Sequence, residues 1–169
     1  MLLFRYLLLI HLFSTLSKLM REAGRRNPNN LETRCQLLTL FDCVARGGEI
    51  KFNQFSDWIY DPRFEIPDIN WHEIKVLKQY AMPMVPHPTS YVCDWFHSLG
   101  CYWACENGLY RQNPKSHVSD FLFPRLHSLR DQTIAKSLTR SIRDNLPPET
   151  PDKIKKSFTS RSIRKGAIT

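Results

Sequence analysis

The sequence predicts a mainly α-helical fold with a small antiparallel β-sheet, which places the chain in the α+β class. The chain has 169 residues, enough for one ordinary domain with a hydrophobic core but hardly for two. Hydrophobic residues make up 42% and charged residues 24%, a globular composition. Apolar residues recur at helical spacing along most of the chain, and only the segment from Phe52 to Pro86 shows a strand-and-turn pattern instead.

The first element is a helix from Leu2 to Ala23, apolar at first and then amphipathic, which Gly24 and the polar loop RRNPNN end. The apolar run over residues 2–13 is shorter than the roughly 20 residues that a bilayer requires. No small-x-small cleavage site follows it. We therefore expect residues 1–29 to form a buried helix, with a secreted or membrane-anchored protein that uses this segment as the alternative.

The middle of the chain predicts a helix, a sheet and a second helix. Asn30 is expected to cap a helix whose apolar side runs to Val44, and Gly47 and Gly48 close or bend it. Prolines and aspartates then break up the apolar residues between Phe52 and Pro86, which predicts two or three antiparallel strands. Helical spacing returns from Tyr91 to Cys105.

The last quarter of the chain carries nearly all of the net charge of +8. From Arg125 onward there are eleven Lys and Arg against four Asp and Glu, whereas the first 124 residues hold thirteen against twelve. An amphipathic helix is expected from Leu126 to Ile142, followed by the linker LPPETP and a last segment that starts at Phe158. Such a localised basic excess suits a polyanionic partner, and a solvated basic helix with a tail is the alternative. The cations that we expect to contact DNA are Arg130, Lys136, Arg140, Arg143 and Lys165.

Several common kinds of site are missing from the sequence. There is no Walker loop, dinucleotide glycine fingerprint, HExxH motif or nucleophile elbow. The series Cys93-x3-His97-x3-Cys101-x3-Cys105 resembles a metal site, but on a helix each step of four residues turns about 40° and rises about 6 Å, so the four ligands cannot converge. We expect no metal, cofactor or small-molecule substrate. Five cysteines, an odd number, favour free thiols in a reducing, intracellular compartment.

Two short segments resemble the arginine boxes of tyrosine recombinases, the phage-integrase type of DNA strand-exchange enzyme. The first is CVARGGEI, in which Arg46 and Glu49 match the family's R-x-x-E after a hydrophobic helix. The second is FTSRSIRKGAIT, in which Thr159, Ile163, Arg164, Gly166 and Thr169 match the pattern T-x-H-x-L-R-x-G-x-A-T and Arg161 stands where the family has histidine. The run from residue 30 to 169 looks most like integrase-like proteins of eukaryotic, algal-type mobile elements.

The resemblance implies a role for each matched residue. Arg46 and Arg164 would clamp the scissile phosphate, because guanidinium groups bind phosphate oxygens bidentately. The family also places a catalytic lysine on a β-hairpin between the boxes, and Lys75 holds the matching position, with Lys78 as the competing choice. The implied partners are DNA and other recombinase subunits, and the implied location in a eukaryote is the nucleus.

The resemblance also implies that activity is lost. The family's third box and its nucleophilic tyrosine follow the second arginine, whereas all six tyrosines here precede Arg164. Arg161 replaces a proton-transferring imidazole with a group that stays protonated. The sequence therefore predicts an incomplete tyrosine-recombinase catalytic-domain fold over residues 30–169, inactive but able to bind DNA.

Two alternatives to this interpretation come from the residues themselves. Arg46 could cap the C-terminus of the preceding helix, with Glu49 as a structural ion-pair partner. The whole chain could also be a basic helical interaction module without recombinase ancestry, its arginines being surface charges.

Overall fold

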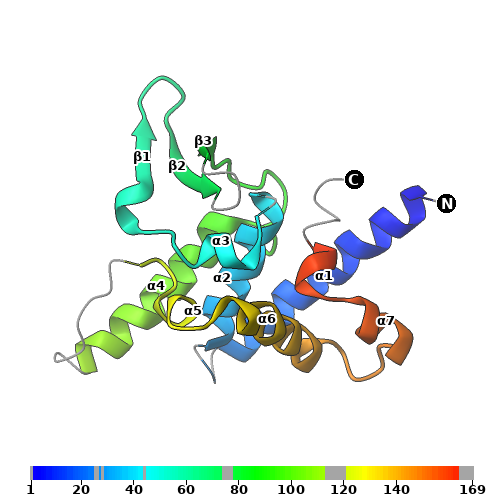
Figure 1. Ribbon diagram of the computed structural model, residues 1–169. Helices are drawn as coiled ribbons and strands as arrows, with labels where there is room; N and C mark the ends of the chain where they lie inside the picture. The colour runs from blue at the N-terminus through cyan, green and yellow to red at the C-terminus, as the bar shows by residue number, and fades with distance from the viewer. Residues whose placement is uncertain are drawn as a thin grey trace.

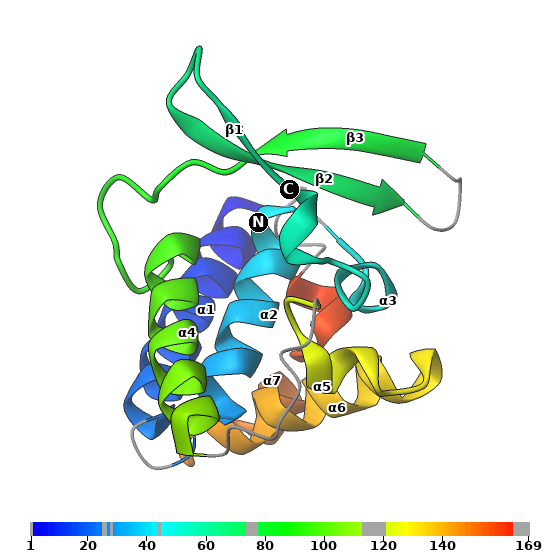
Figure 2. The same cartoon turned by 90° about the vertical axis from the view of Figure 1, so that its left-hand side faces the viewer.

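The computed structural model describes residues 2–24, 27, 29–43, 45–73, 78–112 and 121–163. Four helices form its body, and a three-stranded sheet lies across one end of them (Figure 1, Figure 2). This agrees with the predicted α+β class. The four helices are α1 (Leu2–Gly24), α2 (Asn29–Asp42), α4 (Trp95–Gln112) and α6 (Asp131–Asn145). The shorter elements are α3 (Gly47–Ile50), the 3-10 helix η1 (Phe55–Asp57), α5 (Pro124–His127) and α7 (Asp152–Ser157).

Helix α2 is the centre of the molecule, since it contacts α1, α3, α4 and α6. Its buried leucines join a single core cluster with Phe13, Leu16 and Met20 of α1. The N-terminal helix therefore shares its core with the rest of the chain. Among the described residues, no helix is long and apolar enough to cross a membrane.

The sheet is an antiparallel meander in the order β1-β2-β3, which confirms the predicted small sheet. Its strands are β1 (Trp58–Asp61), β2 (Ile66–Glu73) and β3 (Lys78–Pro83). Ile69 of β2 is fully buried and anchors the sheet on the helices, whereas the β1–β2 turn projects away from the body (Figure 1). Ile69 pairs with Trp58 on one side and with Met82 on the other.

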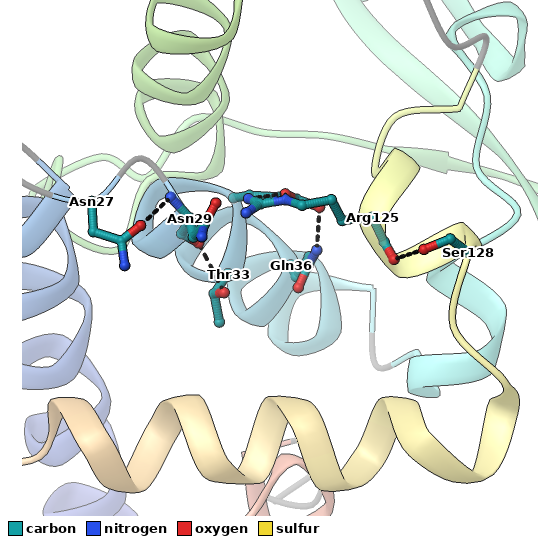
Figure 3. Close-up of polar contacts among 7 residues, drawn as sticks. Asn27, Asn29, Thr33, Gln36, Arg125 and Ser128 are labelled. Atoms are coloured by element: carbon teal, nitrogen blue, oxygen red, sulfur yellow. Dashed lines mark hydrogen bonds and ion pairs between the residues drawn. The ribbon is translucent and has the colours of Figure 1, made fainter. Parts of the chain in front are cut away.

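Two predicted helix starts were wrong, and in each case a side chain sets the boundary. Asn30 lies inside α2, and the amide of Asn29 instead donates to Oδ1 of Asn27 at 3.1 Å (Figure 3). The helix predicted from Tyr91 begins only at Trp95, because Asp94 Oδ1 accepts the amide hydrogen of His97 at 2.6 Å and acts as the N-cap.

The helix predicted to run to Val44 and to close or bend at Gly47 and Gly48 ends earlier, and one predicted continuous helix is divided. Helix α2 ends at Asp42, and the separate helix α3 starts at Gly47, so Arg46 does not cap a helix C-terminus. The helix predicted from Leu126 is split into α5 and α6 by residues 128–130. The Ser128 hydroxyl donates to the carbonyl of Arg125 at 2.7 Å and ends α5 (Figure 3).

Candidate nucleic-acid interface

Arg46 lies in the short segment between α2 and α3. Its backbone is extended (φ −92°, ψ 149°), and its amide donates to Oε2 of Glu49 at 2.6 Å. The Arg46 Nη1 donates to the other oxygen, Oε1, at 2.9 Å. One oxygen of the Glu49 carboxylate therefore accepts the backbone amide before α3, as the carboxylate of a capping box does. The other oxygen accepts a hydrogen bond from the Arg46 guanidinium. The ion pair that was offered as a structural alternative is present, but at a helix N-terminus.

The two partners of this pair differ in exposure. The Glu49 side chain is 7% exposed, whereas the Arg46 side chain is 38% exposed. The carboxylate is thus on the protein side of the pair and the guanidinium on the solvent side. In this arrangement Arg46 reaches solvent from an anchored position, which is what a phosphate contact requires.

Helix α3 is held against α6 by close packing at Gly47. A Cβ atom at Gly47 would lie 3.0 Å from Ile134 Cγ2 and 3.5 Å from Leu138 Cδ1, so a side chain there would press into α6. This close approach fixes the residue that follows Arg46 on the apolar side of α6. A Cβ atom at Gly48 would meet no atom within 4 Å, so the same packing limit does not apply there.

The second box begins with a short helical turn over residues 160–163. Thr159 caps this turn, since the Ser162 amide donates to Thr159 Oγ1 at 3.2 Å and the Thr159 amide donates to Ser162 Oγ at 2.7 Å. Ile163 is fully buried, and Arg161 is exposed. The Ser160 amide also donates to Thr139 Oγ1 of α6 at 3.4 Å. Burial of Ile163 and the bond to Thr139 fix the turn on α6.

The two box segments thus pack against one helix although they are far apart in sequence. Helix α3 contacts α6 through Gly47, and the turn at 160–163 contacts it through Ser160. Both segments lie at a similar height on the same side of α6 in the two views (Figure 1, Figure 2). The second clamp arginine, Arg164, and the predicted catalytic lysine, Lys75, lie outside the described residues. Lys75 falls in the four residues that join the paired ends of β2 and β3, Glu73 and Lys78, and the competing Lys78 is the first residue of β3.

The cations of α6 belong to a different face. At about 100° per residue, Lys136, Arg140 and Arg143 lie opposite Ile134, Leu138 and Ile142 on the helix. The isoleucines and the leucine are buried, and the three cations are exposed beside a shallow hollow of about 480 Å³. This basic face is opposite the side of α6 on which Gly47 of α3 packs, whereas Thr139, which holds the second box segment, lines the same hollow. Arg143 also donates to the carbonyl of Lys156 at 3.3 Å, and Arg130 is exposed just before α6. Lys165, the fifth predicted DNA contact, lies outside the described residues.

Sequence reasoning missed a buried polar network that ties α5 to α2. Arg125 donates through Nε and Nη2 to Oε2 of Glu32, and Gln36 donates to Oε1 of the same carboxylate at 2.8 Å (Figure 3). The Glu32 side chain is 2% exposed and that of Arg125 45%. The spacing of Glu32 and Gln36, four residues apart on one helix face, was the available signal.

The metal-like series of cysteines and histidine gives one close pair. Cys101 Sγ lies 3.6 Å from His97 Nε2. Within the described part of the chain, no group of three or more His, Cys, Asp or Glu side chains is placed to hold a metal ion. All five cysteines are free thiols.

Comparison with known proteins gives no match to any family model, to any curated protein or to any solved structure.

Proposed function

We propose that this chain is a DNA-backbone-binding relative of the front part of the tyrosine-recombinase catalytic domain, and that it does not cut DNA. One observation carries the proposal: the two box segments pack against the same helix, α6, with Arg46 and Arg161 both reaching solvent. Packing on one helix holds arginines from two distant segments in the same part of the fold, and a phosphate clamp requires such arginines to lie within reach of one phosphate.

The chemistry of the described residues favours binding over cleavage. A guanidinium held by a carboxylate on its protein side can donate charge-assisted hydrogen bonds to a phosphate oxygen. Arg161, at the family's histidine position, stays protonated and cannot relay a proton.

The test is the salt dependence of binding to a short DNA duplex, measured by fluorescence anisotropy. Binding through phosphates is expected to be weak and independent of sequence, with Kd on the order of 10⁻⁴–10⁻⁶ M at physiological salt. Arg46→Gln should lower the slope of log K against log salt by about 0.9, the value for one lost phosphate contact.

Arg63→Gln is the matched control. Arg63 is also an exposed arginine in a local ion pair, with Asp61 at 2.7 Å, but it lies on the projecting β1–β2 turn. The two variants change the net charge equally. Equal losses of slope would mean that net charge alone drives binding, and the clamp proposal would fail. A suicide DNA substrate that trapped a tyrosyl–DNA adduct would overturn the claim that the chain does not cut.

The basic face of α6 favours a second candidate, a basic helical interaction module. Lys136, Arg140 and Arg143 are exposed together, opposite the side of α6 on which Gly47 packs. In this case the double variant Lys136→Gln/Arg140→Gln should remove most of the dependence of log K on log salt concentration, while Arg46→Gln should leave that dependence unchanged. The same titration therefore separates the two functions.

A further inference from the structure

A cavity of about 360 Å³ lies between α1, α2 and α4, away from both box segments. It is open to solvent and combines a charged rim with two thiols and an imidazole. The residues that define its chemistry are Arg21, Glu22, Leu31, His97, Cys101 and Cys105. No step of the proposed DNA binding uses this cavity.

Cys101 and His97 form a pair on the wall of this cavity. They lie one helical turn apart on α4, with Sγ and Nε2 3.6 Å from each other. Burial lowers the pKa of His97 below its ordinary value, and the charges of Arg34 and Arg21 lower it further. The imidazole is therefore uncharged near neutral pH, so it can accept a proton from the thiol.

A buried arginine lies behind the pair. Arg34 is 1% exposed, and it donates to Ser17 Oγ at 2.8 Å and to the carbonyl of Val92 at 3.0 Å. Its Nη1 has no hydrogen-bond partner among the described residues. Burial lowers the pKa of Arg34, and the favourable charge interaction that most opposes this effect is with Cys101. Negative charge on a thiolate would thus compensate a buried cation.

The other thiols are in poorer positions to react. Burial raises the pKa of Cys43 to about 12 and raises that of Cys35 as well, so both stay protonated and enclosed. Cys93 does not line the cavity. Cys105 lines it, one turn beyond Cys101, but the imidazole contact belongs to Cys101.

We propose that Cys101 is a nucleophilic thiol, with His97 as its proton acceptor, that forms mixed disulfides with small disulfide molecules entering the cavity. The Cys101 thiol gives its proton to His97 Nε2, and its sulfur attacks one sulfur of the incoming disulfide. A new S–S bond forms as the old one breaks. The departing thiolate takes the proton from His97, so the products are the Cys101 mixed disulfide and one free small thiol.

Several charged and titratable groups surround the reacting sulfur, and each bears on its pH dependence. If His97 accepts the thiol proton, its protonation should appear as a decrease of the reaction rate at acidic pH, which we call the acid-side step of the pH–rate profile. Protonation of His97 below about pH 6.5 removes the proton acceptor, which should slow the reaction. The surrounding groups are Arg21 and Glu22 on α1, Arg34 and Cys35 on α2, Tyr91 and Asp94 before α4, and His97 and Cys105 on α4.

The experiment uses the full chain and the disulfide probe dithiobis(nitrobenzoate), with release of the coloured thiol as the rate and peptide mass spectrometry to locate the adduct. Cys101 should be labelled first, about tenfold or more ahead of the other thiols, and Cys101→Ser should remove this fast phase. Cys105→Ser is the matched control, since it changes a thiol on the same wall, and it should leave the fast phase intact. First labelling at Cys93 or Cys105 would overturn the proposal.

The role of His97 is tested separately. His97→Gln should slow labelling of Cys101 by about a hundredfold and remove the acid-side step from the pH–rate profile. If His97→Gln unfolds the chain, all five thiols will react at one rate. The test then uses His97→Asn and the pH–rate profile of the wild-type chain instead of His97→Gln. A wild-type profile without a step below pH 6.5 would contradict the role of the imidazole.

Discussion

The pair of Glu49 and Arg46 allows a sharp test, because one carboxylate makes two separable contacts. Its Oε2 accepts the backbone amide of Arg46 at 2.6 Å, and its Oε1 accepts the guanidinium at 2.9 Å. The first contact is a helix-capping bond, which stabilises proteins by about 1 kcal/mol. The second joins a half-exposed cation to a buried carboxylate and is expected to add about 1 kcal/mol, at the upper end for exposed pairs.

Glu49→Ala should therefore lower the free energy of unfolding by about 2 kcal/mol. Arg46→Gln removes the ion pair and keeps the backbone amide. In that background Glu49→Ala should still cost about 1 kcal/mol, because the capping bond remains to be lost. The coupling between the two substitutions then isolates the ion pair at about 1 kcal/mol.

Urea unfolding followed by the fluorescence of the four tryptophans supplies all four corners of this double-mutant cycle. Glu49→Ala without cost in the Arg46→Gln background would refute the capping role. A coupling energy indistinguishable from zero would show that Glu49 does not anchor the guanidinium. The clamp proposal would then lose its positioning residue, whatever the DNA titration gives.

Three further predictions concern the core and the cavity. Thr39→Val removes the hydroxyl that accepts the indole N–H of the buried Trp95 at 2.8 Å, and the unpaired N–H should cost about 1–3 kcal/mol in thermal unfolding; an unchanged Tm would mean that the indole finds another acceptor. Arg125→Ala removes the cation that pairs with the buried Glu32 carboxylate, which should cost about 3 kcal/mol in urea, whereas Glu32→Gln/Arg125→Ala should recover part of that loss. Because the pKa of His97 is lowered in the folded state, the unfolded chain binds more protons between that value and about pH 6.5. The stability contributed by His97 should therefore be complete above about pH 6.5 and decrease on acidification. In urea unfolding, the difference between wild type and His97→Gln should be independent of pH above about pH 6.5 and change below it, and a difference that is constant down to about pH 5 would contradict the lowered pKa.

Hydrophobic spacing was enough to predict the long helices and the sheet, but neither where they begin and end nor the short helices α3, α5 and α7. The N-terminal helix, the three-stranded sheet and the amphipathic side of α6 follow from apolar periods of 3.6 and 2, which burial enforces. The starts of α2 and α4 depend on Asn27 and Asp94, single polar side chains whose bonds to backbone amides leave no periodic signal. The position of α3 includes a close approach of Gly47 to α6, a contact between segments far apart in sequence that leaves no periodic signal either.

The candidate site was predicted unevenly for the same reason. The local pair of Arg46 and Glu49 was expected, since the two residues are only three positions apart. The sequence did not separate the cations of α6 from Arg46, because charge counting gives a total and not a direction. The packing of α3 on the buried side of α6 supplies that direction. The buried Arg34 was also missed, since its partners Ser17 and Val92 come from two distant segments.

Two half-exposed arginines in this protein show why exposure alone does not identify a phosphate-binding residue. Arg125 and Arg46 each pair with a buried carboxylate. The Arg125 side chain is 45% exposed and that of its partner Glu32 is 2% exposed. The Arg46 side chain is 38% exposed and that of its partner Glu49 is 7% exposed. Arg125, however, spans two helices and places both Nε and Nη2 on its carboxylate, so its charge serves to join α5 to α2. Arg46 makes its ion pair with Glu49 three residues along the chain, and the second box segment is held on the same helix that α3 contacts. A structural arginine should change the unfolding free energy and leave the salt slope of DNA binding unchanged, whereas a clamp arginine should change both. Arg46 and Arg125 are matched in exposure and in type of partner. Comparing the salt slopes and unfolding free energies of variants at these two positions therefore distinguishes a clamp arginine from a structural arginine most clearly.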